Sequence, residues 1–144
     1  MSDAISIADA ITTELSAATL SQPIAAERGY LPIFDLEEMD DALHVTVVPA
    51  GDTQVALSRS MDQYDFVTEV GVQIRFPGQA FPSNENLDPY MTLVQEIRDF
   101  IRKRRLDTGT KAICTATEAT YSDDHLERLH QFTALIKLRH RVMR

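Results

Sequence analysis

The run Tyr64–Phe76, in which apolar and polar side chains alternate, constrains the fold more than any other feature of the sequence. One set of alternate positions holds Tyr64, Phe66, Thr68, Val70, Val72, Ile74 and Phe76, and the other holds Asp65, Val67, Glu69, Gly71, Gln73 and Arg75. Successive side chains of a strand point to opposite faces, so the pattern is typical of an antiparallel strand with one buried face. A sheet built around this strand needs a second layer to cover its apolar side.

Other segments have the composition of strands, with β-branched residues between turn-forming residues. They are Leu43–Val48, closed by Pro49; Gln54–Arg59, after a predicted turn at Ala50-Gly51-Asp52; Lys111–Tyr121; and Phe132–Val142, which alternates again. The piece Ala26–Leu31 also has the composition to pair as a short strand. Loops are expected at 50–63, around the short Gln54–Arg59 piece, and at 77–87.

Two segments show the spacing of apolar residues that predicts amphipathic helices. In residues 3–20 the stripe is Ala4, Ala8, Ile11, Leu15 and Ala18, and in Asp88–Arg105 it is Tyr90, Leu93, Val94, Ile97, Phe100 and Ile101. Ser2 or Asp3 is the expected cap of the first helix. Asp88 is the expected N-cap of the second, with Pro89 as its first helical residue. Asp123–Leu129 predicts a helical turn capped by Ser122 or Asp123.

The order of these elements predicts one α+β domain over residues 1–144. Its strands follow one another too closely for parallel crossovers, except around the second helix. An antiparallel-dominated mixed sheet with two main helices packed on one face is therefore the expected architecture. The 144 residues fit a single core, and no linker-like stretch divides them.

Charge and composition exclude several classes of protein. The net charge is −8, and residues 1–71 carry 13 acidic and 2 basic side chains, against 9 and 12 in residues 72–144. Such a chain as a whole should repel nucleic acid. No apolar run reaches the roughly 18 residues of a membrane span, and the start of the chain has no features of a secretory signal. One cysteine, Cys114, rules out an intramolecular disulfide and suits a reducing cytoplasm.

No short motif of catalysis, phosphate binding or zinc binding occurs, so we expect no enzymatic activity, no cofactor and no metal. His125 and His130 lie near Asp123 and Asp124, but a separation of five residues does not place two histidines on one helical face. We therefore favour a capped helical turn over a metal site. His44 and His140 are expected to be hydrogen-bonded structural histidines, and Cys114 a buried, inert thiol.

Two charged clusters are candidate contact sites. The acidic cluster is Asp35, Glu37, Glu38, Asp40 and Asp41, and the basic cluster is Arg102, Lys103, Arg104 and Arg105. The acidic cluster lacks the spacing of a calcium loop, and as a solvated loop it needs no function. The basic cluster ends a predicted helix, where positive charge complements the helix dipole. A salt bridge to an acidic partner protein, or DNA contact, is the functional alternative.

Several stretches together resemble the tail terminator, or tail completion, proteins of long-tailed phages with non-contractile tails. They are Glu27-Arg28-Gly29-Tyr30-Leu31-Pro32 with Asp35-Leu36-Glu37-Glu38, then Leu43–Pro49, Asp65–Gln73, and His125-Leu126 with Gln131-Phe132-Thr133-Ala134 and the closing strand. The resemblance covers most of the chain as a pattern of strands and includes no catalytic signature.

The resemblance implies a virion protein of the tail or neck, made in the host cytoplasm. It implies a homo-oligomer, most simply a hexameric ring, on the head-proximal end of the tail tube. The ring would stop tube polymerisation and contact the tail tube protein and the head connector or head-completion protein. DNA would pass through its centre without specific binding, beside the Asp35–Asp41 segment. Another neck or tail-tube-related structural subunit is the alternative, followed by a small-molecule binding module.

Overall fold

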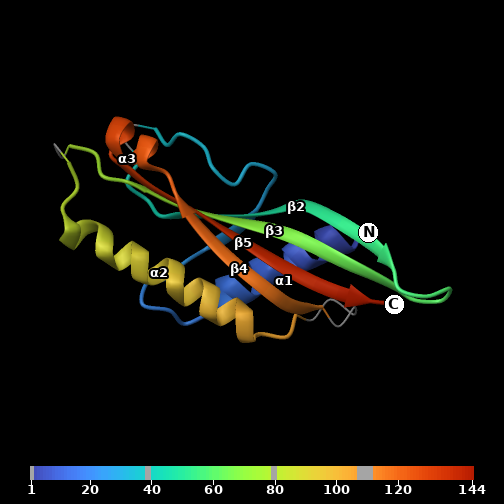
Figure 1. The fold of residues 1–144 in the computed structure, drawn as a ribbon. Coiled ribbons are helices and arrows are strands. Elements are labelled where there is room, and N and C mark those ends of the chain that lie inside the picture. Colours follow the sequence, from blue (N-terminus) through green and yellow to red (C-terminus); the bar gives the residue numbers. More distant parts are fainter. Residues whose placement is uncertain (1, 38–39, 79–80, 107–111) are drawn as a thin grey trace.

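A mixed sheet in the order β1-β2-β3-β5-β4 is the frame of the molecule (Figure 1). The computed structural model describes residues 2–37, 40–78, 81–106 and 112–144. Its strands are β1 (Ala26–Arg28), β2 (His44–Ala56), β3 (Asp62–Arg75), β4 (Ile113–Tyr121) and β5 (Gln131–Met143). Only β1 pairs in parallel, with β2, and all other pairs are antiparallel. The expected antiparallel-dominated mixed sheet is thus confirmed.

The alternating run forms β3, in the middle of the sheet. Phe66, Val70 and Val72 on one face are buried in the core, as the alternation predicts. The partner β5 pairs with β3 along nearly its whole length, with Val70 opposite Ile136. The predicted Phe132–Val142 strand lies within β5, and all of its even-numbered positions are buried, together with Thr133.

The turn predicted at residues 50–52 is wrong, because β2 continues through it to Ala56. The pairing with β3 shifts register between Pro49 and Gly51, so the extra residue is accommodated as a β-bulge. The predicted strand 43–48 and the first part of the predicted strand 54–59 therefore belong to one strand, which ends at Ala56. The actual hairpin turn lies at residues 57–61, where the amides of Leu57 and Ser58 donate to the carbonyl of Met61. Most of the predicted loop 50–63 is strand.

Helix α1 (Asp3–Ala17) begins as predicted and ends three residues early. The Ser2 hydroxyl accepts a hydrogen bond from the Ile5 amide at 3.2 Å, which confirms Ser2 as the cap. Ala18 is already extended. Beyond it, the Ser21 amide and hydroxyl both donate to Glu96 on the second helix, and this contact holds the chain in a non-helical course.

Helix α2 (Asn84–Lys103) begins four residues before the predicted Asp88. Ser83 is its N-cap, and the Ser83 carbonyl accepts from the amides of Asn86 and Leu87. Pro89 consequently lies inside the helix and not at its first position. Proline is tolerated near a helix start because few backbone hydrogen bonds are lost there.

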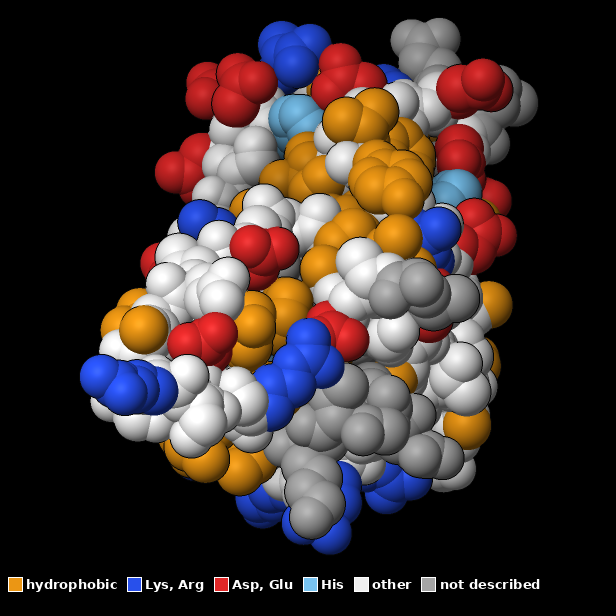
Figure 2. Space-filling model, turned by 90° about the vertical axis from the view of Figure 1, so that its right-hand side faces the viewer, with side chains coloured by type: hydrophobic (Ala, Val, Ile, Leu, Met, Phe, Trp, Pro, Cys, Tyr) orange, Lys and Arg blue, Asp and Glu red, His pale blue; other side chains and the backbone are white. Residues whose placement is uncertain are grey.

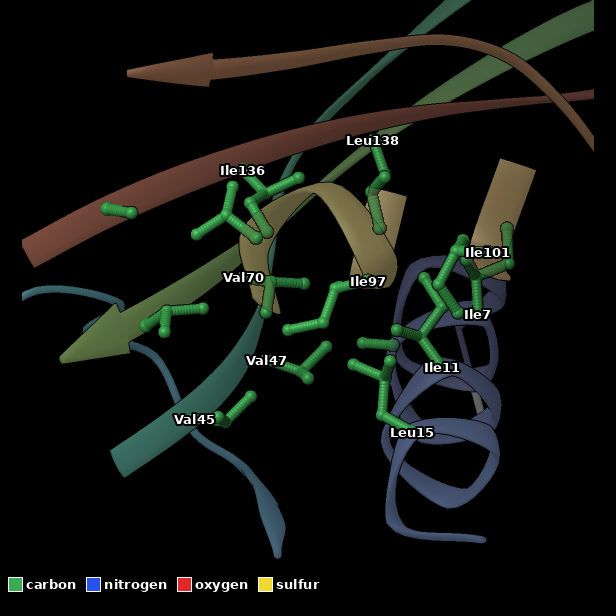
Figure 3. Packing of buried hydrophobic residues seen from close by; sticks show 14 of the residues in the cluster. Ile7, Ile11, Leu15, Val45, Val47, Val70, Ile97, Ile101, Ile136 and Leu138 are labelled. Carbon is green, nitrogen blue, oxygen red and sulfur yellow. The ribbon is translucent and has the colours of Figure 1, made fainter. Parts of the chain in front are cut away.

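Both long helices pack on the same face of the sheet and together close the core (Figure 3). The labelled side chains converge from α1 (Ile7, Ile11, Leu15), α2 (Ile97, Ile101), β2 (Val45, Val47), β3 (Val70) and β5 (Ile136, Leu138). All ten have 2% exposure or less. Burial of this apolar surface is the main stabilising contribution, at about 25 cal/mol per Å². The prediction of two main helices on one face is confirmed.

The third helix, α3 (Asp123–Leu129), coincides with the predicted helical turn. The Ser122 hydroxyl accepts from the His125 amide at 3.2 Å, so Ser122 is the cap. His130 ends the helix in the left-handed conformation, at φ 52°, and turns the chain into β5. Strand β4 is an outer strand of the sheet, and Lys111, part of the predicted strand, lies outside the described residues.

Candidate functional site

The face of the sheet opposite the long helices is covered at one end by an irregular segment. We call residues 32–37 the strap, because they cross over β3 and β5 on this face. The Pro32 carbonyl lies against Gly71 of β3, and the backbone of Phe34 and Leu36 is bound by side chains of β3 and β5. The other end of the same face, towards the β2–β3 hairpin, bears charged side chains and no strap.

A buried pair of glutamines anchors the strap. Gln131 on β5 and Gln73 on β3 are both fully buried. The side-chain oxygen Oε1 of Gln131 accepts from the Leu36 backbone amide at 2.9 Å, and the side-chain amides of both glutamines donate to the Phe34 backbone carbonyl. Arg75 donates to the Leu36 carbonyl at 2.7 Å. Buried polar groups are costly unless paired, so these bonds fix the strap in one position.

A second layer connects the anchor to the acidic residues. The Gln131 amide nitrogen also contacts the Thr133 hydroxyl at 3.0 Å, and His125 lies 2.9 Å from the same hydroxyl. The other ring nitrogen of His125 is 3.1 Å from the Asp35 carboxylate. Helix α3 thus orients His125 toward the strap, and the network runs from the sheet interior to the surface.

Gly71 is the position that permits this close approach. A Cβ atom at Gly71 would lie 1.7 Å from the Pro32 carbonyl oxygen and 2.6 Å from its carbonyl carbon. Any side chain here would displace the strap backbone, because real carbon–oxygen contacts are much longer. A glycine inside a strand is therefore explained by the backbone that crosses it.

The structure divides the predicted acidic cluster into bound and free carboxylates. Asp35 pairs with His125, and Asp40 pairs with His44 at 2.7 Å. The Ala42 amide and, less strongly, the His44 ring hold the pKa of the Asp40 carboxyl below its usual value. Glu37 and Asp41 are exposed. Glu38, also predicted to line a channel, lies outside the described residues.

The predicted basic cluster lies at the end of α2, on the helix side of the sheet. Arg104 forms intramolecular contacts: it forms an ion pair with Glu14 of α1 at 2.8 Å, and its guanidinium lies over the Phe100 ring. Arg102, Lys103 and Arg105 are exposed and form no ion pair with other described residues. Figure 2 shows many of the acidic side chains of this view toward its top, and several Lys and Arg side chains at its base. The strap is bound to the sheet face opposite the long helices, so its acidic residues and the cluster at the end of α2 lie on opposite sides of the sheet.

A further charged group was not predicted; it lies on the open face, by which we mean the part of the sheet face opposite the long helices that the strap does not cover. Asp65 of β3 accepts from Arg141 of the neighbouring β5 at 2.9 Å, and Arg139 lies 4.0 Å away. The Arg141 hydrogen bond holds the pKa of the Asp65 carboxyl below its usual value. The alternation already placed all three residues on the polar faces of their strands. Their adjacency depends on the β3–β5 register, which the sequence does not reveal.

The histidines and the cysteine occupy different environments. The hydrogen bond predicted for His44 is confirmed. For His140 it is wrong within the described residues: the side chain is fully buried, both ring nitrogens lack partners there, and burial lowers its pKa to about 4. His125 faces the strap, whereas His130 contacts the Phe81 ring. Cys114 is buried, which raises the pKa of its thiol and suits an inert role.

Across the described ranges, no three His, Cys, Asp or Glu side chains are grouped to hold a metal ion. Nor is any helix in these ranges long and apolar enough to cross a membrane. A fixed acidic strap, exposed basic side chains on the other side of the sheet, and a charged open face are the features a function must use. The sequence matches no protein-family model and no curated protein.

Proposed function

We propose that this protein is a subunit of a closed ring at the head-proximal end of a phage tail tube. In this role it ends tube polymerisation and joins the tail to the head connector. The protein would act in the tail or neck of the virion after synthesis in the host cytoplasm. The sequence resemblance motivates the proposal, and the structure supplies surfaces suited to it.

The observation that carries the proposal is the rigid attachment of the acidic strap. Its backbone is bound by three side chains of the sheet, so Glu37, the last residue of the strap, has a fixed support. A channel for DNA needs walls that repel phosphate without changing shape, and ordered carboxylates provide that. Asp35 and Asp40 contribute negative charge at the same end while their histidine contacts keep them in place.

The placement of the two charged clusters on opposite faces favours stacking along a tube axis. The acidic strap is bound to one face of the sheet, and Arg102, Lys103 and Arg105 lie at the end of α2 on the other face. A partner ring with an acidic surface would meet the basic side, and complementary charges would guide the encounter. The negative net charge of the whole chain also opposes tight DNA binding.

A different tail-tube or neck subunit is the second candidate. Strand β4 favours it, because this outer strand has a single charged residue, Glu118, and no proline. Outer strands of this kind pair readily with strands of other chains, and such pairing could join successive subunits of a tube.

Electron microscopy of the purified protein, with and without isolated tail tubes, tests the proposal. Rings in solution or capping one end of each tube are the expected result. Binding along the length of the tube, or incorporation into it, would instead support a tube subunit. A protein that remains monomeric and never binds tubes would overturn both.

A further inference from the structure

The two ends of the long axis of the molecule bear unlike apolar features. At one end the β2–β3 hairpin extends beyond the rest of the sheet (Figure 1). At the other end, α3 lies near the start of α2. The hairpin turn exposes Leu57 by 50% and Met61 by 45%, although residues of this kind usually bury against a core. No part of the described core lies close enough to the tip to cover them.

A small pocket lies at the opposite end. It has a volume of about 210 Å³ and lies between the first turns of α2, the end of β4 and α3. Its apolar lining is Leu87, Met91, Tyr121, Leu126 and Phe132. Most small-molecule sites occupy about 300–1,000 Å³, so this pocket fits one or two side chains better than a metabolite.

Charge matches between the two ends. Arg59 is the only charged residue of the hairpin turn 57–61, and it forms no ion pair with the described residues. Asp88 and Asp123 line the pocket, are exposed, and are likewise without a cation among those residues. A hairpin turn entering the pocket would bring one arginine to two carboxylates, and its leucine and methionine to an apolar lining.

We propose that the hairpin turn of one copy of this chain inserts into the α2–α3 pocket of the next copy. The turn and the pocket are at opposite ends, so one chain cannot satisfy its own pocket. Contacts between unlike surfaces are heterologous, and they produce a ring when the rotation closes or a filament when it does not. The inference deepens the proposed ring and rests on it only for closure; the contact itself is a separate claim.

Cross-linking of single-cysteine chains tests the contact. Cys114 is first changed to Ala, and Ser58→Cys at the tip and Asn84→Cys at the pocket are then made in separate chains. A short bismaleimide is added to each chain alone and to an equal mixture. The contact predicts a covalent dimer in the mixture and little in either chain alone, since each chain carries its thiol at one end only.

Two substitutions serve as a matched pair. Leu57→Asp in the Ser58→Cys chain should reduce the dimer yield at least severalfold by placing a charge in the apolar pocket. Ile113→Asp is the control, because Ile113 is exposed by 63% and lies at neither end of the contact. It should leave the yield unchanged. Circular dichroism of each variant verifies that the fold persists.

The outcomes separate the contact from the ring. A mixed dimer abolished by Leu57→Asp, together with rings by microscopy, supports both. A mixed dimer with open filaments alone supports the contact and overturns the closed ring. Rings without any mixed dimer, or a dimer unaffected by Leu57→Asp, overturn the contact and leave the ring standing. Neither rings nor mixed dimer would overturn both.

Discussion

The Pro32 carbonyl oxygen occupies the space that a side chain on Gly71 would need, at 1.7 Å from an ideal Cβ. This relationship ties an irregular acidic segment to the central strand of the sheet. The contact joins the backbone of Pro32 to the backbone of Gly71, so there is no flexible side chain that could rotate away to make room. The position of the strap therefore depends on a missing side chain.

Gly71→Ala should displace the strap and destabilise the protein by about 1–3 kcal/mol, as overpacking usually does. Urea unfolding gives the free energy, and hydrogen exchange at the Leu36 amide reports on the strap. Gly51→Ala is the control, since a Cβ there meets nothing within 4 Å. Equal effects of the two substitutions would contradict this account of the strap.

Gln131→Leu should cost about 1–3 kcal/mol, because it leaves the buried Leu36 amide without its acceptor. The Phe34 carbonyl would keep Gln73 as a donor, so the strap should loosen more at Leu36 than at Phe34. Amide exchange resolved by residue separates these positions. Uniform loosening along the strap would argue that Gln131 acts on packing alone.

Burial of His140 should make stability depend on pH. Its folded pKa of about 4 lies below the unfolded value of 6.5, so the unfolded chain binds the proton more readily between these values. Stability should therefore fall as pH drops from about 6.5 to 4, by roughly 3 kcal/mol in total. His140→Leu should remove most of this slope in urea unfolding between pH 4 and 7. A slope unchanged in the variant would assign it to other groups.

The basic cluster should separate into a structural and an assembly part. Arg104→Ala removes the contact with Glu14 and should lower stability by up to about 1 kcal/mol. The combined change of Arg102, Lys103 and Arg105 to Glu should lower stability by only about 1 kcal/mol, through the helix dipole, but should weaken binding to tail tubes strongly. Sedimentation with tubes measures the second effect. Tube binding that survives the charge reversal would remove these residues from the interface.

Glu37→Lys with Asp41→Lys should make the protein retain DNA, in a manner that weakens as salt is raised. Both residues are exposed, so the fold should persist. Fluorescence anisotropy with a labelled duplex measures the binding. The matched control is Glu85→Lys with Asp99→Lys, which makes the same charge change on α2. Equal DNA binding by the control would show that only net charge matters.

The elements of the fold were largely predictable because they depend on local patterns. The alternation in 64–76 and 132–142 reports directly on which side chains are buried. The start of α2 was not predicted correctly. Asp88-Pro89 has the composition of a helix start, but the helix begins one turn earlier, at Asn84, with Ser83 as its N-cap. The bulge after Pro49 was also missed, since Ala50-Gly51-Asp52 has the composition of a turn.

The strap lay beyond prediction because its anchors are distant in sequence. Leu36 and Gln131 are 95 residues apart, and a glutamine on the polar face of a strand gives no sign that it is buried. One hint was present: Gly71 lies in the interior of β3, where a residue with a side chain would ordinarily pack on the face of the sheet. A glycine at such a position suggests a closely approaching backbone, without identifying which segment approaches.

The place of β5 has a consequence for how the chain folds during synthesis. β5 follows every other described element in the sequence, yet it lies between β3 and β4 in the sheet. Until β5 leaves the ribosome, β3 has an unpaired inner edge and β4 has no neighbour. Such long-range pairing slows folding, and open edges bind other chains. We expect the nascent chain to be most prone to aggregation, and most dependent on chaperones, in the interval between the synthesis of β4 and that of β5.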